Sequence, residues 1–212
     1  ILLLATHSDL SDVAVNRLAQ RQALFHAGSH PKGHMPGEAA CALMLASADW
    51  PMHPPEPDDA DLAPIAWVHR PALARRDKSV DAGGKVQSTV LSQVIEHAQT
   101  ASQLGLDQIT ALVCDGDQHT ARSTELFGAT LALMPDLDAI DDMRLTGTVC
   151  GGPGAATPLA VIAAACAHAQ AQGQPVMAAC LGDTHARLAL VVRPQQPGDA
   201  SVLPSAAAPS QA

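Results

Sequence analysis

Aromatic side chains are almost absent from this chain of 212 residues. They make up 2% of the sequence, with two Phe, two Trp and no Tyr. Hydrophobic residues nevertheless reach 47% and charged residues only 16%, which is typical of a globular protein and excludes a disordered one. The core therefore has to be built from Ala, Leu, Val, Ile and Met, in one domain or in part of a larger one.

Positive charge is also scarce. The chain has 12 Lys and Arg against 21 Asp and Glu, which gives a net charge of -9. This argues against a nucleic-acid partner, because such binding needs a clustered positive face. No run of 18 apolar residues occurs, so the sequence predicts no membrane span.

The sequence contains no Cys-x-x-Cys pair. Its cysteines are odd in number and lie in apolar or alanine-rich settings: Cys41, Cys114, Cys150, Cys166 and Cys180. This pattern predicts reduced, buried thiols in a cytoplasmic protein rather than a disulfide framework. A redox or metal module has little support, because no ligand pair has metal-binding spacing, and we expect no cofactor.

Histidines recur every four residues at His26, His30 and His34. Pro31 and two glycines lie among them, so the three imidazoles cannot share one helix face. We predict a loop and no metal site. Convergence of the three loop imidazoles on zinc stays open as an alternative.

Hydrophobic periodicity predicts an alternating series of strands and helices. In order, these are a buried strand over 1–5, a helix over 8–20, an apolar run of ambiguous type over 38–47, an exposed loop over 49–64, a strand near Trp67 and Val68, a helix over 84–104 stopped by Gly105, a strand over 108–115, helices over 123–134 and 154–172, and a hairpin over 175–194. This order predicts an α/β layered fold with helices packed on a mixed sheet.

The expected domain covers residues 1–194, followed by a disordered Pro/Ala/Ser-rich tail over 195–212. The chain opens on Ile1 inside an apolar run, and we expect it to be a fragment of a longer polypeptide.

Three segments, in this order, are similar to one family. "GHMPGEAACALML" is similar to that family's "GFxPGEGAAALVL", "GGPGAATPLAVIAAACAHAQAQG" to "GHxxGAAGxxxxxxAxxAL", and "CLGDTHARLALVV" to "FGFGGxNxxLVL". Between them, "LVCDGDQHTARSTELFG" stands where the family carries "HGTGTxxGDxxE", and it matches better a divergent branch with "DLNGExxRxxEWG". With these segments in this order, the chain resembles the C-terminal half of the β-ketoacyl synthases. Those enzymes condense acyl-carrier-protein thioesters.

The resemblance implies a thiolase-like layered fold, of which this chain is the second half. It implies a mixed sheet with buried and flanking helices. It also implies that Gly154 and Ala155 start a long buried helix, and that they line the acyl pocket together with Gly182 and Asp183 of the closing turn.

The catalytic groups that the resemblance calls for are missing. The cysteine nucleophile would lie upstream of Ile1, and the two histidine positions fall at Cys114 or Asp115 and at Gly151. An inward Asp183 would place negative charge where an enolate develops, which is the wrong sign for stabilising it. Condensation by this half alone is therefore physically implausible.

Two other histidines are candidate substitutes. His119 lies in the loop of the missing first histidine, and His185 replaces the asparagine of the closing motif. They could form a rewired acid–base pair, although loop histidines are more often solvated. Cys114 could be reactive, but an inert buried thiol is the more common case.

Two functions follow from the resemblance. One is an acyltransferase-class, β-ketoacyl synthase-like protein, catalytically impaired in this half. The other is a non-catalytic pseudoenzyme that acts as a scaffold or partner subunit. The implied partners are the N-terminal half, an acyl carrier protein or acyl thioester, and a second subunit in a homo- or heterodimer. A basic set could meet an acidic carrier protein by electrostatic steering: Arg70, Arg75, Arg76 and Lys78.

Overall fold

The computed structural model describes residues 1–47, 66–82, 84–152 and 154–195. Its elements, in chain order, are β1 (Leu2–Ser8), α1 (Asp12–Gln20), β2 (Glu38–Met44), β3 (Ala66–Val68), β4 (Ala72–Arg75), α2 (Thr89–Ser102), the 3-10 turn η2 (Leu106–Gln108), β5 (Ala111–Cys114), α3 (Thr120–Leu133), β6 (Met143–Leu145), α4 (Thr146–Cys150), the 3-10 turn η3 (Gly154–Ala156), α5 (Thr157–Gln172), β7 (Val176–Cys180) and β8 (Ala186–Pro194).

A six-stranded mixed sheet forms the centre of the molecule. Its order is β3-β8-β7-β5-β6, and β4 also pairs with β8. β5 runs parallel to both β6 and β7, whereas β7 and β8 form the predicted antiparallel hairpin. Every residue of β5 and β7 is buried, as expected for central strands that are covered on both faces. The predicted α/β layered fold with a mixed sheet is confirmed.

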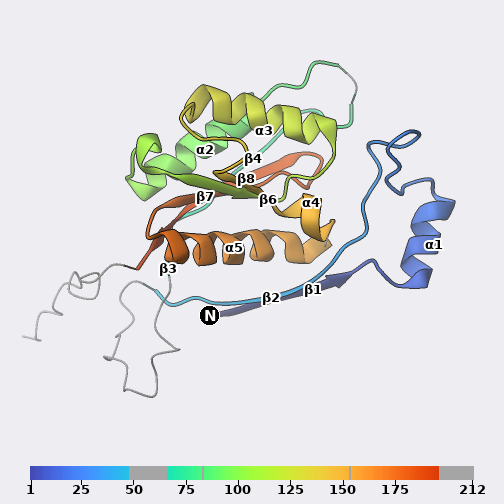
Figure 1. Cartoon of the computed structure of the whole chain (residues 1–212), viewed down its shortest axis with the longest axis horizontal. Helices are drawn as coiled ribbons and strands as arrows, with labels where there is room; N and C mark the ends of the chain where they lie inside the picture. The colour runs from blue at the N-terminus through green and yellow to red at the C-terminus, as the bar shows by residue number, and fades with distance from the viewer. Residues whose placement is uncertain (48–65, 83, 153, 196–212) are drawn as a thin grey trace, which may run out of the picture.

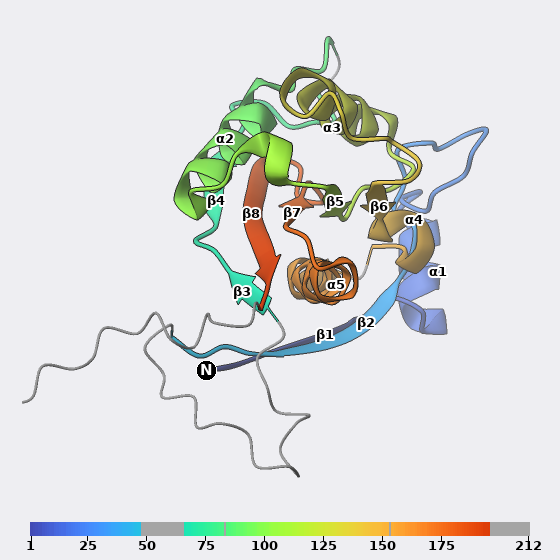
Figure 2. The ribbon, with the colours of Figure 1, turned by 60° about the vertical axis from the view of Figure 1, so that its left-hand side comes forward.

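Helices cover the two faces of this sheet in separate layers. α2 and α3 lie on one face, and α5 lies on the other (Figure 1). α5 is itself covered by the two-stranded sheet of β1 and β2 (Figure 2). Ala165 and Ala169 of α5 are fully buried, and their small side chains allow the helix to approach the sheet closely. The core between α5 and the sheet is therefore filled by close backbone packing over alanines, without large aromatic side chains.

One helical stretch in the described part of the chain, Gly154–Gln172, is long and apolar enough to cross a membrane by length and composition. It contains α5, which lies between the two sheets (Figure 2). A core helix of this kind passes the same criterion, so the stretch carries no argument for a membrane.

Burial of the first strand differs from the prediction. β1 is a strand, but Ile1, Leu2 and Leu4 are 85%, 66% and 70% exposed. β1 pairs antiparallel with β2, with Leu2 opposite Met44, and Met44 is 82% exposed. α5 covers only the inner face of this pair, so its outer face exposes an apolar patch formed by Leu2, Leu4, Ala42 and Met44. The exposed polar pair Ser8 and Glu38 lies at the other end of this face.

Several element boundaries also differ from the prediction. α2 begins at Thr89, five residues later than position 84, and Gln103 ends it with a φ of 61° before Gly105 is reached. The ambiguous run over 38–47 forms a strand, β2, and α3 begins earlier than predicted, at Thr120. The short elements β4, β6 and α4 are not predicted. The expected loop over 49–64 and the tail after Gln195 lie outside the described residues.

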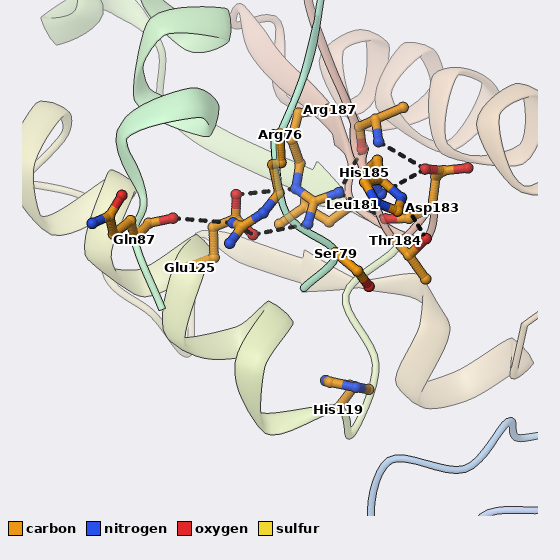
Figure 3. Close-up of polar contacts among 12 residues, drawn as sticks. Arg76, Ser79, Gln87, His119, Glu125, Leu181, Asp183, Thr184, His185 and Arg187 are labelled. Carbon is orange, nitrogen blue, oxygen red and sulfur yellow. Dashed lines mark hydrogen bonds and ion pairs between the residues drawn. The ribbon is translucent and has the colours of Figure 1, made fainter. Parts of the chain in front are cut away.

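A buried ion-pair cluster ties α3 to β8. Arg187 and Glu125 are both fully buried, and the Arg187 guanidinium donates to the two Glu125 carboxylate oxygens at 3.0 and 2.9 Å (Figure 3). Arg76, which follows β4, contacts the same carboxylate at 2.7 Å. Two guanidinium groups thus compensate one buried negative charge, and Arg76 does not belong to the expected surface set.

We predict that Glu125→Ala lowers the free energy of unfolding by about 3–5 kcal/mol, because it leaves the buried Arg187 charge uncompensated. Urea unfolding measures this change. Arg75→Ala is the matched control on an exposed neighbour of Arg76 and should change stability by less than about 0.5 kcal/mol. The Glu125→Leu, Arg187→Leu double variant should be more stable than Glu125→Ala. Equal stability of Glu125→Ala and the original protein would contradict this account.

We also predict that the 212-residue chain alone is poorly soluble or aggregates, because the outer face of β1 and β2 is apolar. Replacing Leu4 and Met44 by Lys should shift the protein toward a monodisperse species in size-exclusion chromatography. Leu131→Lys is the control, since Leu131 is 76% exposed on α3, away from this face. Monodisperse behaviour of the unmodified chain would refute the prediction.

Candidate functional site

The candidate site lies at the carboxyl ends of β5 and β7. These strands are parallel neighbours with Cys114 opposite Ala179, so Asp115 and Leu181 leave the sheet at the same edge. The Asp115 carboxylate accepts hydrogen bonds from the backbone N–H groups of Leu181 at 2.6 Å and Gly182 at 2.8 Å. A Cβ added to Gly182 would lie 2.8 Å from this carboxylate, so a larger residue at position 182 would force the Asp115 side chain to move.

Asp115 is 6% exposed, and its electrostatic surroundings are mixed. Burial raises its pKa above the ordinary 3.8. The hydrogen bonds from Leu181 and Gly182, together with the charge of Arg122, act in the opposite direction without cancelling the effect. Asp115, one of the two residues at which the resemblance places the family's first histidine, is therefore a buried carboxyl group that accepts from two main-chain donors.

Cys114, the alternative residue at that histidine position, is fully buried. Burial raises the pKa of its thiol to about 12, against a partial lowering by the Gly116 N–H group. The thiol is thus protonated at neutral pH and is not a nucleophile, as expected for an inert buried cysteine.

Contrary to the prediction, the cysteines are not all buried. All five are free, but Cys150 is exposed and Cys41 is half-buried, whereas Cys114, Cys166 and Cys180 lie in the core. Burial raises the pKa of Cys166 to about 11 and that of Cys180 well above 9.0.

His119 caps the start of α3 and is only 3% exposed. Its Nε2 lies 2.7 Å from an oxygen of Asp81, and its backbone N–H donates to Asp117. Asp117 in turn pairs with Arg122 at 2.7 Å. Among the described residues, buried polar atoms without a partner concentrate in this loop: His119 Nδ1, both amide atoms of Gln118 and Arg122 Nε. Such a concentration is unusual in a folded protein and marks the loop as a candidate site.

His119 and His185 do not meet. His119 lies apart from the closing turn, and the segment that carries Ser79 runs between them in this view (Figure 3). That segment is bound to the turn by hydrogen bonds from Arg76 N to His185 O and from Val80 N to Thr184 O, each 2.9 Å. His185 Nδ1 lies 3.0 Å from Thr184 Oγ1. The structure thus brings no imidazole pair together at this position.

Asp183 does not point inward, contrary to the expectation. It is exposed, and its Oδ1 accepts hydrogen bonds from the N–H groups of His185 and Ala186, both at 2.7 Å. These bonds lower the pKa of Asp183 below 3.8. The negative charge next to the strand ends therefore comes from Asp115, not from Asp183.

The glycine turn before α5 is contacted by histidines that the sequence did not single out for this place. Gly154 has a φ of 52°, and a Cβ there would lie 2.7 Å from the His7 ring; one on Gly152 would lie 2.7 Å from the His34 ring. The Nε2 atoms of His7 and His34 are each 3.0 Å from the same Asp9 oxygen. Two imidazoles from distant segments thus lie beside Gly152 and Gly154, in the turn that follows Gly151, where the resemblance places the second histidine. No local sequence pattern predicts this approach.

The other two members of the histidine series serve the loop itself. His26 and His30 exchange backbone hydrogen bonds, and His26 Nδ1 accepts from the N–H groups of Gly28 and Ser29. Over the residues that the structure describes, no group of three or more His, Cys, Asp or Glu is placed to hold a metal ion.

Two depressions open to solvent. One, at the amino end of β5, is lined by residues that include Ile109, Met134 and Leu137. The other, on β1 and β2, is lined by residues that include His7 and Glu38. Neither contains Gly154, Ala155, Gly182 or Asp183, so the acyl pocket that the resemblance implies at these turns remains a prediction.

Comparison with known proteins gives matches in structure but not in sequence. No protein-family model and no curated protein matches the chain. A type II polyketide ketosynthase in complex with its acyl-carrier protein matches 92% of this chain and 56% of its own, with a TM-score of 0.63 at 13% identity. A β-ketoacyl synthase from Burkholderia phymatum matches with a TM-score of 0.59 at 14% identity, over 92% and 55% of the two chains. The ishigamide ketosynthase/chain length factor gives 0.58 at 16%, over 92% and 49%.

The chain spans about half the length of these three structures. At such low identity the likeness concerns the fold, and it agrees with the order of the three sequence segments. The chain has the thiolase-like α/β fold of the ketosynthases.

Proposed function

We propose that this chain is a β-ketoacyl synthase-like protein of the acyltransferase class whose present half supplies framework and no reacting group. The observation that carries this proposal is the Asp115 carboxylate. This carboxylate is buried and accepts hydrogen bonds from the Leu181 and Gly182 amides, and Asp115 is one of the two residues, with Cys114, at which the resemblance places the family's first histidine.

Three features of the described residues oppose condensation chemistry. A thiolate is needed to take the acyl group, but burial raises the pKa of the Cys114 thiol to about 12. A developing enolate needs positive or hydrogen-bond-donating groups, but the two amides at the strand ends already serve a carboxylate. His119, a candidate base, has its Nε2 2.7 Å from Asp81 and lies apart from His185 (Figure 3).

The exposed outer face of β1 and β2 favours the second candidate function, a non-catalytic scaffold or partner subunit. An apolar face of this kind is typical of an interface. The ketosynthase/chain length factor among the structural neighbours supports a paired arrangement, either with a second subunit or with the other half of the fold. In both cases the partner covers this face.

An acyl carrier protein is the proposed second partner, and the neighbour bound to its acyl-carrier protein supports this choice. Arg70, Arg75 and Lys78 are exposed and could attract an acidic carrier protein through steering. Arg76 is not part of this exposed set, because it forms an ion pair with the buried Glu125.

We predict that the full-length protein does not decarboxylate a malonyl thioester above background, because the residues to which the resemblance assigns the two histidines, Cys114 or Asp115 and Gly151, carry no imidazole. Release of carbon dioxide from malonyl-pantetheine measures this. The His119→Ala, His185→Ala double variant should behave like the original protein. Turnover in the original protein that this double variant loses would overturn the proposal and establish a rewired acid–base pair.

We further predict that iodoacetamide at pH 8 alkylates Cys150 first, because Cys150 is exposed while Cys114, Cys166 and Cys180 are buried thiols of raised pKa. Peptide mass spectrometry over time ranks the five sites. Cys150→Ser is the control, and it should abolish the fast phase. Fast modification of Cys114 in the folded protein would show a reactive thiol and contradict the assignment.

A further inference from the structure

We propose that the depression at the amino end of β5 is a docking site for a basic peptide segment of a partner protein, anchored by an aliphatic side chain. The site combines an apolar floor with an acidic rim. The inference does not rest on the proposed function, because the depression lies at the amino end of β5 and Asp115 follows its carboxyl end.

The depression forms where the chain enters two neighbouring strands. Met134 caps the carboxyl end of α3, and Pro135, which has no backbone N–H group to continue a helix, begins the segment that leads to β6. Because β5 and β6 are parallel, the segments that precede them lie at the same edge of the sheet. Hydrogen bonds fix this edge: Leu137 N–H donates to Met134 O at 3.1 Å, and Leu112 N–H donates to Asp142 O at 2.9 Å. The depression is therefore part of the folded framework.

The floor of the depression is apolar. Ile109 and Met134 are buried, and the half-buried Leu106, Leu133 and Leu137 also line it. Its volume is about 450 Å³, which lies within the range of about 300–1,000 Å³ for ligand sites. An aliphatic side chain that enters such a hollow loses contact with water, and this burial stabilises the complex.

Carboxylates form the rim. Asp107, Asp136 and Asp142 line the depression, and the first two are exposed. One oxygen of Asp142 accepts from the Asp138 N–H group at 2.9 Å. Among the residues that the structure describes, no Lys, Arg or His forms an ion pair with the three lining carboxylates. Arg144, which follows on β6, donates to main-chain carbonyl groups instead. The negative charge of the rim is thus available to the cations of a partner.

The floor and the rim together define the chemistry of the occupant. An aliphatic side chain fits the floor, and a Lys or Arg on either side reaches the carboxylates while its methylene stem lies on the apolar wall. Charge complementarity of this kind selects the partner and speeds its approach. A second copy of this chain is disfavoured, because each copy carries a net charge of -9. An acidic carrier protein would be repelled by this rim, so the site takes a different partner from the one proposed for the basic set.

The test measures binding of the fluorescein-labelled peptide KLRLK to the full-length protein by fluorescence anisotropy. Two control peptides separate the two features of the site. KGRGK keeps the charge but should bind at least about tenfold more weakly, because it buries no aliphatic side chain. ELELE keeps the aliphatic groups and reverses the charge, and it should not bind. High salt should weaken the binding of KLRLK, because ion pairs at an exposed rim are screened.

Variants of the rim locate the site. Asp107→Asn combined with Asp136→Asn should weaken the binding of KLRLK about fivefold, because two exposed ion pairs are lost. Asp12→Asn combined with Asp77→Asn is the matched control. These two carboxylates are also exposed, but they lie on α1 and after β4, so this variant should bind like the original protein. Equal affinity of the two double variants, or of KLRLK and KGRGK, would overturn the proposal.

Methyl NMR on the unmodified full-length protein is a second readout that needs no variant. The Ile109 and Met134 methyl signals should move as KLRLK is added, with the affinity measured by anisotropy. Those of Val161, buried in α5 on the other face of the sheet, should not move. Unmoved Ile109 and Met134 signals at saturating peptide would overturn the proposal. Self-association in sedimentation that the Asp107→Asn, Asp136→Asn variant loses would also overturn it, because the occupant would then be a second copy of this chain.

Discussion

The parallel pairing of β5 with β7 is the constraint on which the rest of the site depends. It places the residues that follow both strands at one edge of the sheet, so that Asp115 faces Leu181 and Gly182. β8 then returns antiparallel to β7 and delivers Arg187 to Glu125 on α3. Polar contacts therefore join α3 and the turn after β7 to the central sheet. They are the hydrogen bonds of Asp115 to the turn and of Arg187 to Glu125.

Two buried carboxylates, ten residues apart, are compensated in different ways. Glu125 meets two guanidinium groups and forms a structural tie between α3, β8 and the segment after β4. Asp115 meets main-chain amides instead, which are neutral dipoles. Arginine compensates the Glu125 charge fully, so this ion pair stabilises the fold. Arginine compensates Asp115 only in part, and burial raises the pKa of Asp115. The pKa of Asp115 is thus set by burial, which raises it, against two hydrogen bonds and Arg122, which lower it.

Local sequence pattern predicted much of this architecture. Apolar runs of strand length correctly predicted β5, β7 and β8. A strand that is buried on both faces does not need alternating polar and apolar residues. The helical period correctly predicted α2 but not its start, which is Thr89 rather than position 84. The residue pattern over 84–88 fits an extended chain as well as a helix. The burial of β1 was predicted wrongly. An apolar strand predicts burial against another element. The sequence pattern does not identify that element, and the described residues leave Ile1, Leu2 and Leu4 exposed.

The candidate site was less accessible to sequence reasoning. The order of motifs pointed to the loop after β5 and to the closing turn, and both lie where the parallel strands end. The direction of side chains could not be derived, so Asp183 was assigned the inward charge that Asp115 carries. The approach of His7 and His34 to the glycine turn depends on contacts between segments more than a hundred residues apart, for which no local pattern exists. Long-range polar contacts, rather than element types, therefore separate a working condensing site from a framework of the same shape. In this chain the Asp115 contacts join the ends of β5 and β7.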